Sequence, residues 1–484
     1  MNAPIKRVAI AILALFIALL LNINYVQVID AASLRNNSHN SRILLFQYSH
    51  ERGPIIVGGQ EIAKSVPTGD SLKYLREYPG GAEFAPVTGF YSLVYGATGI
   101  EAAENSILAG DDSRLFVRRL SDLLTGRAPQ GGAIVLTINA KAQQAAWAAM
   151  QGKQGAVVAL DPRTGAILAL VSSPSYDPSP LSSHNTAQIQ ATYQNLLRAP
   201  GNPLLDRALE ESYPPGSMFK IVDLATAFST GQYTAQTQLP TPNALLLPET
   251  TVLLHNFAGE SCGNGVTDTI ADAFRISCNT AFAGLGLKLG IGRLAAQAKK
   301  FGFGTGLSVP LPVAASQFSN GANLPNTALA SIGQYDDAVT PLQAAMVSAA
   351  IANNGVLMAP YLVQRVEAPD LSTISQAQPQ QLGTPVSPAV ASQIKQLMEL
   401  VVNSGTGTAA QIPGIQVAGK TGTANHGAPG TPPDAWFTAF APADNPAVAV
   451  AVIVENGGGL GGNDATGGAV AAPIARAVIQ AVIG

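Results

Sequence analysis

The apolar positions are concentrated first in one unbroken run near the N-terminus. Lys6 and Arg7 precede 14 consecutive apolar residues, Val8 to Leu21, and a mostly apolar segment continues to Val28. The 21 residues from Val8 to Val28 would form roughly 31 Å of helix at ~1.5 Å per residue, enough to cross a bilayer. A signal peptide is the alternative, but Asp30-Ala31-Ala32 is a poor cleavage site. We therefore expect an uncleaved anchor over residues 1–30, its basic end in the cytoplasm and the rest of the chain outside.

The next apolar segments are shorter and alternate with turns. Residues 31–135 are rich in turn residues and contain no cluster of catalytic residue types. Residues 133–150 read as a strand that passes into a helix with alanines at helical spacing. Residues 155–174 are two apolar runs joined by Asp161-Pro-Arg-Thr-Gly165, which predicts a β-hairpin. Because both arms are almost entirely apolar, we expect both faces of this hairpin to be covered.

The remaining pattern predicts helices first and strands afterwards. The pattern predicts helices over 217–231, 279–304 and 387–405, and the last of these begins with Ser387-Pro388, a pair that favours a helix start. Apolar strands follow at 415–424, 434–442 and 447–455, before a final helix at 470–483. Strands at both ends of this region with helices between them predict one sheet covered by helices, an α/β (α+β) fold.

Composition narrows the functional classes. The 484 residues suggest two or three folded units, 12% are charged, and the net charge is −3. No basic stripe is present, so no nucleic-acid partner is expected. Two cysteines, Cys262 and Cys278, lie beyond the anchor, where a disulfide can persist. We expect them to be bonded, and two free buried thiols remain the alternative.

A serine and a lysine stand three residues apart after a chain break. Pro214, Pro215 and Gly216 precede Ser217-Met-Phe-Lys220, which places Ser217 in the first turn of a helix and Lys220 on the same face. A lysine can act as the base for such a serine only if burial or a nearby cation lowers its pKa. The same S-x-x-K spacing recurs at Ser392–Lys395 inside an amphipathic helix, where we expect no catalytic role.

Two further short motifs follow in a fixed order. Ser277-Cys-Asn279 lies between Ser217 and the single K-T-G of the chain, Lys420-Thr421-Gly422-Thr423. Alternation along a strand would place Lys420 and Gly422 on one face, where the absent side chain of the glycine leaves room for a substrate backbone. Each motif is weak alone, but their order together is specific for penicillin-binding proteins and serine β-lactamases.

The chain resembles the class B penicillin-binding proteins, in particular the short penicillin-binding protein A type of mycobacteria and related actinobacteria. The resemblance is carried by Arg52-Gly53, APVTGFYS, LTINAKAQQAAW, LDPRTGAILAL, NPLLDRALEESYPPGSMFK, SCNTAF, TPLQAA, GKTGTA and AWFTAFAP. Two departures are visible: the class B signature after Arg52-Gly53 is degenerate, and the common G-Q-G reads Gly333-Gln334-Tyr335. Neither departure touches the three catalytic motifs.

The resemblance implies a role for each motif residue. Ser217 would attack the carbonyl between two D-alanines, and Lys220 would accept its proton. Ser277 would relay a proton to the departing D-alanine, and Asn279 would orient the donor peptide. Lys420, Thr421, Gly422 and Thr423 would bind the substrate, with Lys420 also helping to keep Lys220 neutral. No metal or cofactor is implied, and His426, which follows the K-T-G strand, is interpreted as a loop residue.

The resemblance also implies an organisation. It predicts a cytoplasmic stub and transmembrane anchor (1–30), a non-catalytic pedestal or dimerisation-like domain (31–135) and a penicillin-binding transpeptidase domain with an antiparallel sheet flanked by helices (136–484). The expected ligands are peptidoglycan stem peptides and β-lactam antibiotics, and the expected partners are cell-wall synthesis or division proteins. A D,D-carboxypeptidase, a β-lactamase, or a non-enzymatic β-lactam sensor or division scaffold remain alternatives.

Overall fold

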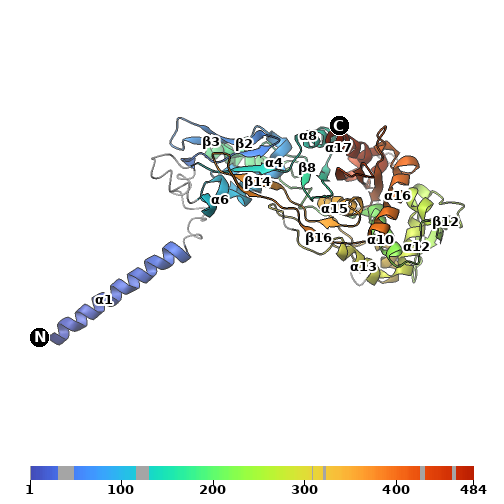
Figure 1. The fold of residues 1–484 in the computed structure, drawn as a ribbon, viewed down its shortest axis with the longest axis horizontal. Helices are drawn as coiled ribbons and strands as arrows, with labels where there is room; N and C mark the ends of the chain where they lie inside the picture. Colours follow the sequence, from blue (N-terminus) through green and yellow to red (C-terminus); the bar gives the residue numbers. More distant parts are fainter. Residues whose placement is uncertain are drawn as a thin grey trace.

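The first described element is a long helix that projects from the rest of the molecule. The computed structural model describes residues 2–30, 48–115, 130–307, 309–319, 323–425, 431–459 and 465–484. Helix α1 (Asn2–Asn24) continues as a wider π turn over Tyr25–Ile29 and extends away from the folded part (Figure 1). Pro4–Ile29 is long and apolar enough to cross a membrane, and none of its most apolar stretch is buried against the protein. This agrees with the predicted anchor.

The pedestal contains a six-stranded sheet that the sequence pattern did not predict in full. Its strand order is β15-β14-β6-β1-β2-β3. The strands are β1 (Ile55–Val57), β2 (Gln60–Pro67), β3 (Tyr74–Glu77), β6 (Ala133–Leu136), β14 (Val363–Glu367) and β15 (Thr373–Gln376). Only β1 and β6 pair in parallel; the other neighbours are antiparallel. Strands β14 and β15 follow the S-x-x-K and S-x-N motifs in the chain, so this sheet combines strands from before and after those motifs.

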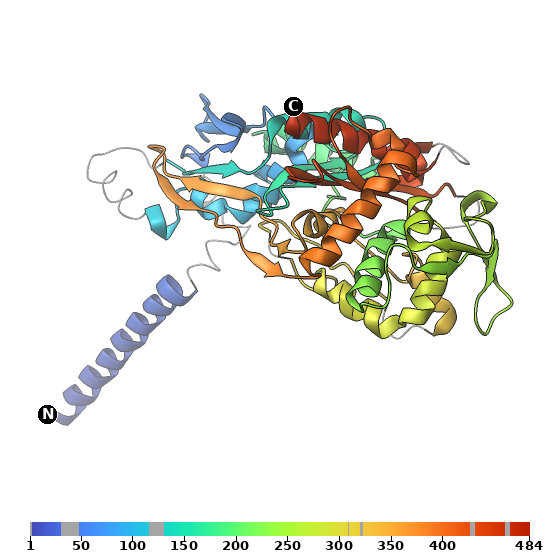
Figure 2. The ribbon, with the colours of Figure 1, turned by 45° about the vertical axis from the view of Figure 1, so that its right-hand side comes forward.

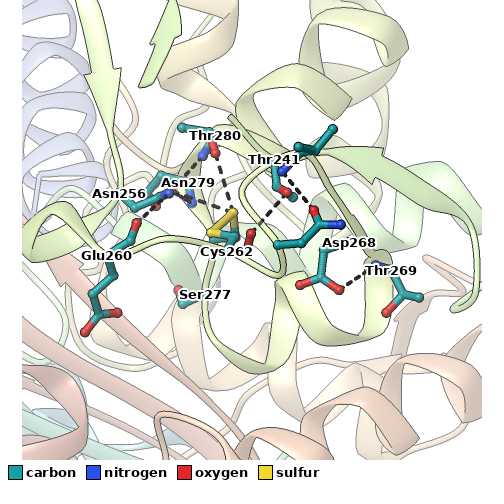
Figure 3. The surroundings of a disulfide bond; sticks show 12 residues. Thr241, Asn256, Glu260, Cys262, Asp268, Thr269, Ser277, Asn279 and Thr280 are labelled. Carbon is teal, nitrogen blue, oxygen red and sulfur yellow. Dashed lines mark hydrogen bonds between the residues drawn. A yellow bond between two sulfur atoms is a disulfide. The ribbon is translucent and has the colours of Figure 1, made fainter. Parts of the chain in front are cut away.

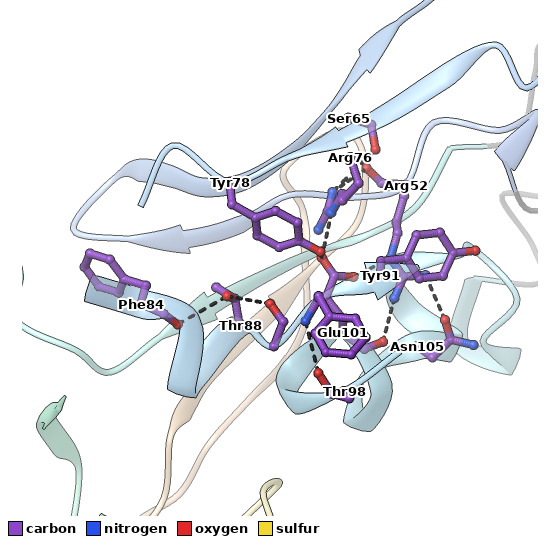
Figure 4. A network of polar contacts seen from close by, with 12 residues as sticks. Arg52, Ser65, Arg76, Tyr78, Phe84, Thr88, Tyr91, Thr98, Glu101 and Asn105 are labelled. Atoms are coloured by element: carbon purple, nitrogen blue, oxygen red, sulfur yellow. Dashed lines mark hydrogen bonds and ion pairs between the residues drawn. The ribbon is translucent and has the colours of Figure 1, made fainter. Parts of the chain in front are cut away.

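A buried ion network holds the pedestal together (Figure 4). Helices α4 (Gly81–Thr88), α5 (Gly99–Ala103) and α6 (Asn105–Leu108) and the short pair β4 (Tyr91–Ser92) and β5 (Gly96–Ala97) surround it. Glu101, fully buried, accepts from Arg52 Nε at 2.5 Å and from Arg76 Nε at 2.6 Å. The Arg52 guanidinium also lies 4.3 Å from the centre of the Tyr91 ring. Arg52, one of the residues that carried the class B resemblance, is therefore a structural centre of this domain.

The part of the chain that carries the three motifs is built on a five-stranded antiparallel sheet of order β17-β18-β19-β7-β8. Its strands are β7 (Gly155–Leu160), β8 (Ile167–Ser173), β17 (Ala418–Ala424), β18 (Asp434–Ala441) and β19 (Val448–Val454). The predicted hairpin is the β7–β8 pair. Sequence-distant β7 and β19 pair side by side, which joins the two ends of the domain as predicted.

Helices cover both faces of this sheet, which explains why its strands lack polar alternation. Alternate residues of β7 pack on α8 (Ala140–Met150) and α17 (Ala472–Ile483) on one face, and the intervening residues pack on the other side with α10 (Lys220–Ser229) and α15 (Pro341–Ala352). Figure 2 shows α17 in dark red on one side of the sheet and the green and yellow helical lobe on the other. Every residue of β18 and β19 is buried.

Most of the remaining elements form the lobe that carries the S-x-N motif. They are the helices α11 (Ile270–Arg275), α12 (Asn279–Leu289), α13 (Ile291–Lys300), α14 (Leu324–Ala330) and α16 (Pro388–Ser404) and the short strands β9 (Gln238–Pro240), β10 (Ala244–Leu246), β11 (Leu253–His255) and β12 (Thr267–Thr269). Helix α9 (Thr186–Arg198) lies instead against the pedestal, where Tyr193 stacks on Tyr95, and β13 (Leu357–Met358) pairs with β16 (Gln381–Gly383). The helical text at 279–304 is two helices, because Gly290 adopts φ 80° and ends α12. Ser387 caps α16 as predicted, with its side chain accepting from Val390 N.

Candidate active site

Ser217 lies in a tight turn that feeds directly into a buried helix. Gly216–Phe219 form one 3-10 turn, and α10 begins at Lys220. Gly216 adopts φ 53°, and a Cβ there would come within 2.8 Å of the Thr423 carbonyl oxygen. Only glycine lets the turn approach strand β17 this closely. The proline and glycine break before Ser217 therefore brings the serine against the K-T-G strand.

A second glycine supports the same turn from behind. Gly333 accepts the backbone N–H of Gly216 at 2.8 Å, and a Cβ on Gly333 would collide with the Gly216 carbonyl at 2.1 Å. Two residues later, Tyr335 holds φ 67° although it is not glycine. Tyr335, where the common motif has its second glycine, thus adopts a left-handed backbone conformation. Gly333, the position that contacts the Ser217 turn, is still a glycine.

Lys220 is fully buried and is held by the S-x-N motif. Its Nζ donates to the Ser277 carbonyl at 2.7 Å and to Asn279 Oδ1 at 2.8 Å, and lies 3.4 Å from Ser277 Oγ. Burial and the nearby charge of Lys420 hold the Lys220 pKa well below its ordinary value, against the opposing effect of Asp223. A neutral amine has two N–H donors, and both find acceptors here. Its lone pair is then available to a proton from another direction.

Ser277 connects the two lysines of the site. Lys420 Nζ donates to Ser277 Oγ at 2.8 Å and to the Thr421 carbonyl at 2.9 Å. Lys420 is also fully buried, and burial lowers its pKa to about 7. Ser277 adopts φ 65°, a left-handed conformation that is uncommon for a non-glycine residue. The hydroxyl therefore accepts from Lys420 and keeps its own hydrogen for another partner.

The K-T-G strand differs in one respect from the expected arrangement. Gly422 is buried, and a Cβ there would lie 3.0 Å from Met218 Cγ and 2.9 Å from Trp436 Cβ. Its missing side chain admits the Ser217 turn rather than leaving an open face for substrate. Thr421 and Thr423 line the cleft instead, because β17 is an edge strand whose outer side is not covered by another strand.

The motif residues surround one cleft of about 270 Å³. Its lining includes Ser217, Ser277, Asn279, Thr421, Thr423 and Thr406. Lys220 and Lys420 lie behind this lining, with their amines directed to Ser277. Ser217 Oγ has no hydrogen-bond partner among the described side chains. The second S-x-x-K does not line this cleft, and its Lys395 pairs with Asp444 at 2.8 Å. His426 lies outside the described residues.

A larger cavity of about 580 Å³ lies elsewhere, between α4, α5 and residues 203–210. It contains none of the motif residues, so size does not identify the active site in this molecule. The motifs, the buried lysines and the cleft at Ser217 coincide only in the smaller site.

Cys262 and Cys278 form a disulfide beside the cleft (Figure 3). Cys278 is the middle residue of the S-x-N motif, and Cys262 lies in the loop that joins β11 to β12. The bond ties this loop to the start of α12, next to Ser277 and Asn279.

Comparison with known proteins agrees with this geometry. Residues 155–480 match the penicillin-binding protein transpeptidase domain, and residues 52–134 match the penicillin-binding protein A dimerisation domain. The chain therefore belongs to the penicillin-binding transpeptidase family, of class B.

Particular relatives match over the whole chain. The peptidoglycan D,D-transpeptidase PbpA of Mycolicibacterium smegmatis is 48% identical over 491 residues, covering 100% of this chain and 99% of that protein. PbpA of Mycobacterium tuberculosis is 47% identical over 495 residues with the same coverage. The ceftriaxone acyl-enzyme structure of M. tuberculosis penicillin-binding protein A superposes with a TM-score of 0.88 at 47% identity, covering 91% of this chain and 100% of that one.

Proposed function

We propose that this protein is a peptidoglycan D,D-transpeptidase that forms an acyl-enzyme at Ser217 and is acylated there by β-lactams. One observation carries the proposal: the S-x-x-K, S-x-N and K-T-G residues meet in a single cleft, in which the first lysine is bound by both polar residues of the second motif. Relatives at 47–48% identity over their full length are named for this activity, and one has been solved as its acyl-enzyme with ceftriaxone.

Acylation begins with removal of the Ser217 proton. Neutral Lys220 donates to Ser277 and Asn279, so its lone pair accepts the proton as Ser217 Oγ bonds to the carbonyl carbon of the donor D-alanine. The backbone N–H groups of Ser217 and Thr423 stabilise the oxyanion, a contribution of ~3 kcal/mol in comparable sites. The amide C–N bond then breaks, and the terminal D-alanine leaves with a proton delivered through Ser277.

Substrate binding uses the opposite wall of the cleft. The Thr421 and Thr423 side chains reach the cleft from β17 and bind the terminal carboxylate of the stem. Lys420 adds positive charge behind them, and the side-chain amide of Asn279 orients the donor backbone. The Gly422 position contributes indirectly, by admitting the Ser217 turn.

The second half-reaction distinguishes this function from its rivals. In a transpeptidase the amine of a second stem attacks the Ser217 ester, and in a carboxypeptidase or β-lactamase water does so. A D-Ala-D-Ala donor peptide and a free-amine acceptor peptide, analysed by mass spectrometry, separate the two. We expect a crosslinked product lacking one D-alanine, none from Ser217→Ala, and wild-type yield from Ser392→Ala, the serine of the second S-x-x-K. Hydrolysed donor alone would assign a carboxypeptidase instead.

The cell membrane is the proposed location, with one span and an extracytoplasmic catalytic domain. The long exposed helix and the basic residues Lys6 and Arg7 before it support this topology. We further propose the boundaries 1–30, 31–135 and 136–484 for anchor, pedestal and catalytic domain, with cell-wall synthesis or division proteins as partners of the pedestal. Fusion of a periplasm-active reporter to the C-terminus tests the orientation: activity supports it, and inactivity with full expression contradicts it.

A further inference from the structure

The helix that carries Asn279 begins without a cap of its own. Helix α12 starts at Asn279, and the preceding residue, Cys278, makes no side-chain bond to its first N–H groups. The Cys278 sulfur is committed to the disulfide with Cys262. Several other helices of the protein are capped by the residue immediately before them. These residues are Asn139, Asn185, Thr269, Asn323, Thr340 and Ser387. The first N–H groups of α12 need an acceptor from elsewhere.

Asn256 supplies that acceptor from the loop after β11 (Figure 3). Its Oδ1 accepts from Asn279 N at 2.9 Å and from Thr280 N at 3.0 Å. Its Nδ2 donates to the Glu260 carbonyl at 3.0 Å, and the side chain is 7% exposed. Two backbone donors on one end of the amide and a carbonyl on the other fix its orientation. Asn256 thus makes the bonds of an N-cap from more than twenty residues away.

The contacted helix turn is the one that organises the catalytic amine. Asn279 contacts both groups: its backbone N–H donates to Asn256 Oδ1, and its side-chain Oδ1 accepts from Lys220. A movement of this turn therefore moves an acceptor of Lys220 and the amide that lines the cleft. The preceding Ser277 sits in a left-handed conformation that its own sequence does not favour. The backbone preference of Ser277 does not hold the S-x-N motif in this conformation. Contacts with other parts of the chain must therefore hold it there.

We propose that Asn256 is a positioning residue for Asn279 and, through it, for Lys220, and that the disulfide fixes the loop that presents it. Cys262 lies six residues after Asn256 and is bonded to Cys278, which directly precedes the capped turn. The loop is thereby closed on the helix it caps. This inference rests on the proposed function, because its consequence is measured as acylation of Ser217.

The test compares Asn256→Ala with Asn185→Ala. Asn185 caps α9 with the same geometry, accepting from Ala187 N at 3.1 Å and Gln188 N at 3.2 Å, but α9 carries no motif residue. Acylation by fluorescent penicillin and the melting temperature are measured for both. We expect Asn256→Ala to lower the acylation rate constant at saturating penicillin about 10-fold or more, and Asn185→Ala to leave it unchanged. The acylation rate constant should decrease because Lys220 accepts the Ser217 proton in the acylation step.

A conservative variant guards against a folding defect. Asn256→Asp keeps an oxygen for both N–H groups but loses the Nδ2 donor to the Glu260 carbonyl, so we expect it to recover part of the acylation rate that Asn256→Ala loses. Equal acylation rates in Asn256→Ala and Asn185→Ala would overturn the inference, as would an Asn256→Asp that folds and is as slow as Asn256→Ala. Failure of the wild type itself to be acylated would refute the proposed function instead.

Discussion

Replacing Lys420 by methionine should stabilise the fold while it abolishes acylation. Lys420 is fully buried, and burial lowers its pKa to about 7 from an ordinary value of 10.5. The unfolded chain therefore binds a proton more tightly at this residue than the folded protein does. A buried lysine of this kind destabilises the folded state over the whole range in which the unfolded lysine is charged. Methionine has a similar length and no charge to desolvate.

The size of the effect follows from the shift in pKa. A displacement from 10.5 to about 7 corresponds at neutral pH to about 4 kcal/mol of destabilisation. The substitution also removes the hydrogen bonds of Lys420 to Ser277 Oγ and to the Thr421 carbonyl, each worth about 1 kcal/mol. The net gain is about 2 kcal/mol, or roughly 3 °C in melting temperature for a domain of this size.

The destabilisation of the fold by Lys420 depends on pH. The destabilisation is complete below about pH 7, where folded and unfolded lysine are both charged, and disappears as the pH rises towards 10.5. Thermal unfolding of Lys420→Met and wild type at pH 6.5 and pH 9.5 measures it, with Lys395→Met as control. Lys395 is 23% exposed and pairs with Asp444, so its loss should change stability by less than about 1 kcal/mol. A Lys420→Met variant that melts below wild type at pH 6.5, or a difference that does not shrink with pH, would refute the reasoning.

Three further outcomes are expected. Asp223→Asn should keep the acylation rate within about threefold of wild type. Asp223 is buried, neither of its carboxyl oxygens is bonded to a described residue, and burial raises its pKa well above the ordinary value. A tenfold loss of acylation rate would show that the carboxylate is needed. Glu101→Gln should lower the unfolding free energy by about 3 kcal/mol or more, because Arg52 and Arg76 stay buried without a counter-charge; denaturant unfolding measures this, and an unchanged midpoint contradicts it. Cys262→Ser should lower stability by about 3 kcal/mol and slow acylation by penicillin, and an unchanged melting temperature together with an unchanged rate contradicts both expectations.

The sequence was sufficient to predict which motif residues meet in one cleft and which strands form the sheet beside it. Three short motifs in a fixed order brought together Ser217, Lys220, Ser277, Asn279 and Lys420, because each motif marks a local structure: a turn before a helix, a loop before a helix, and a strand. Their catalytic roles stay a prediction. The β7–β8 hairpin and the buried strands at the end of the chain followed from their apolar runs and turn residues. The second S-x-x-K was correctly separated by its position inside the amphipathic helix α16.

The contacts that depend on distant pairing could not be predicted. Strand β14 joins the pedestal sheet by pairing with β6, more than 200 residues earlier, and β15 is added at the edge by pairing with β14. The residues of these strands carry no signal that specifies this pairing. Gly422 was expected to leave room for substrate, but its neighbours are the Ser217 turn and Trp436, which come from other parts of the chain. The Asn256 cap is equally non-local. An asparagine before a turn has no signal in sequence that it will cap a helix beginning 23 residues later.

The most direct test of the account is the mass of the intact protein after treatment with penicillin. Ser217 lines the cleft, and burial holds the pKa of nearby Lys220 well below its ordinary value, so we expect only this serine to react. We predict a shift by one penicillin adduct for wild type and for Ser392→Ala, and no shift for Ser217→Ala. A wild-type protein that stays unmodified, or a Ser217→Ala variant that still gains one adduct, would contradict the assignment of the nucleophile.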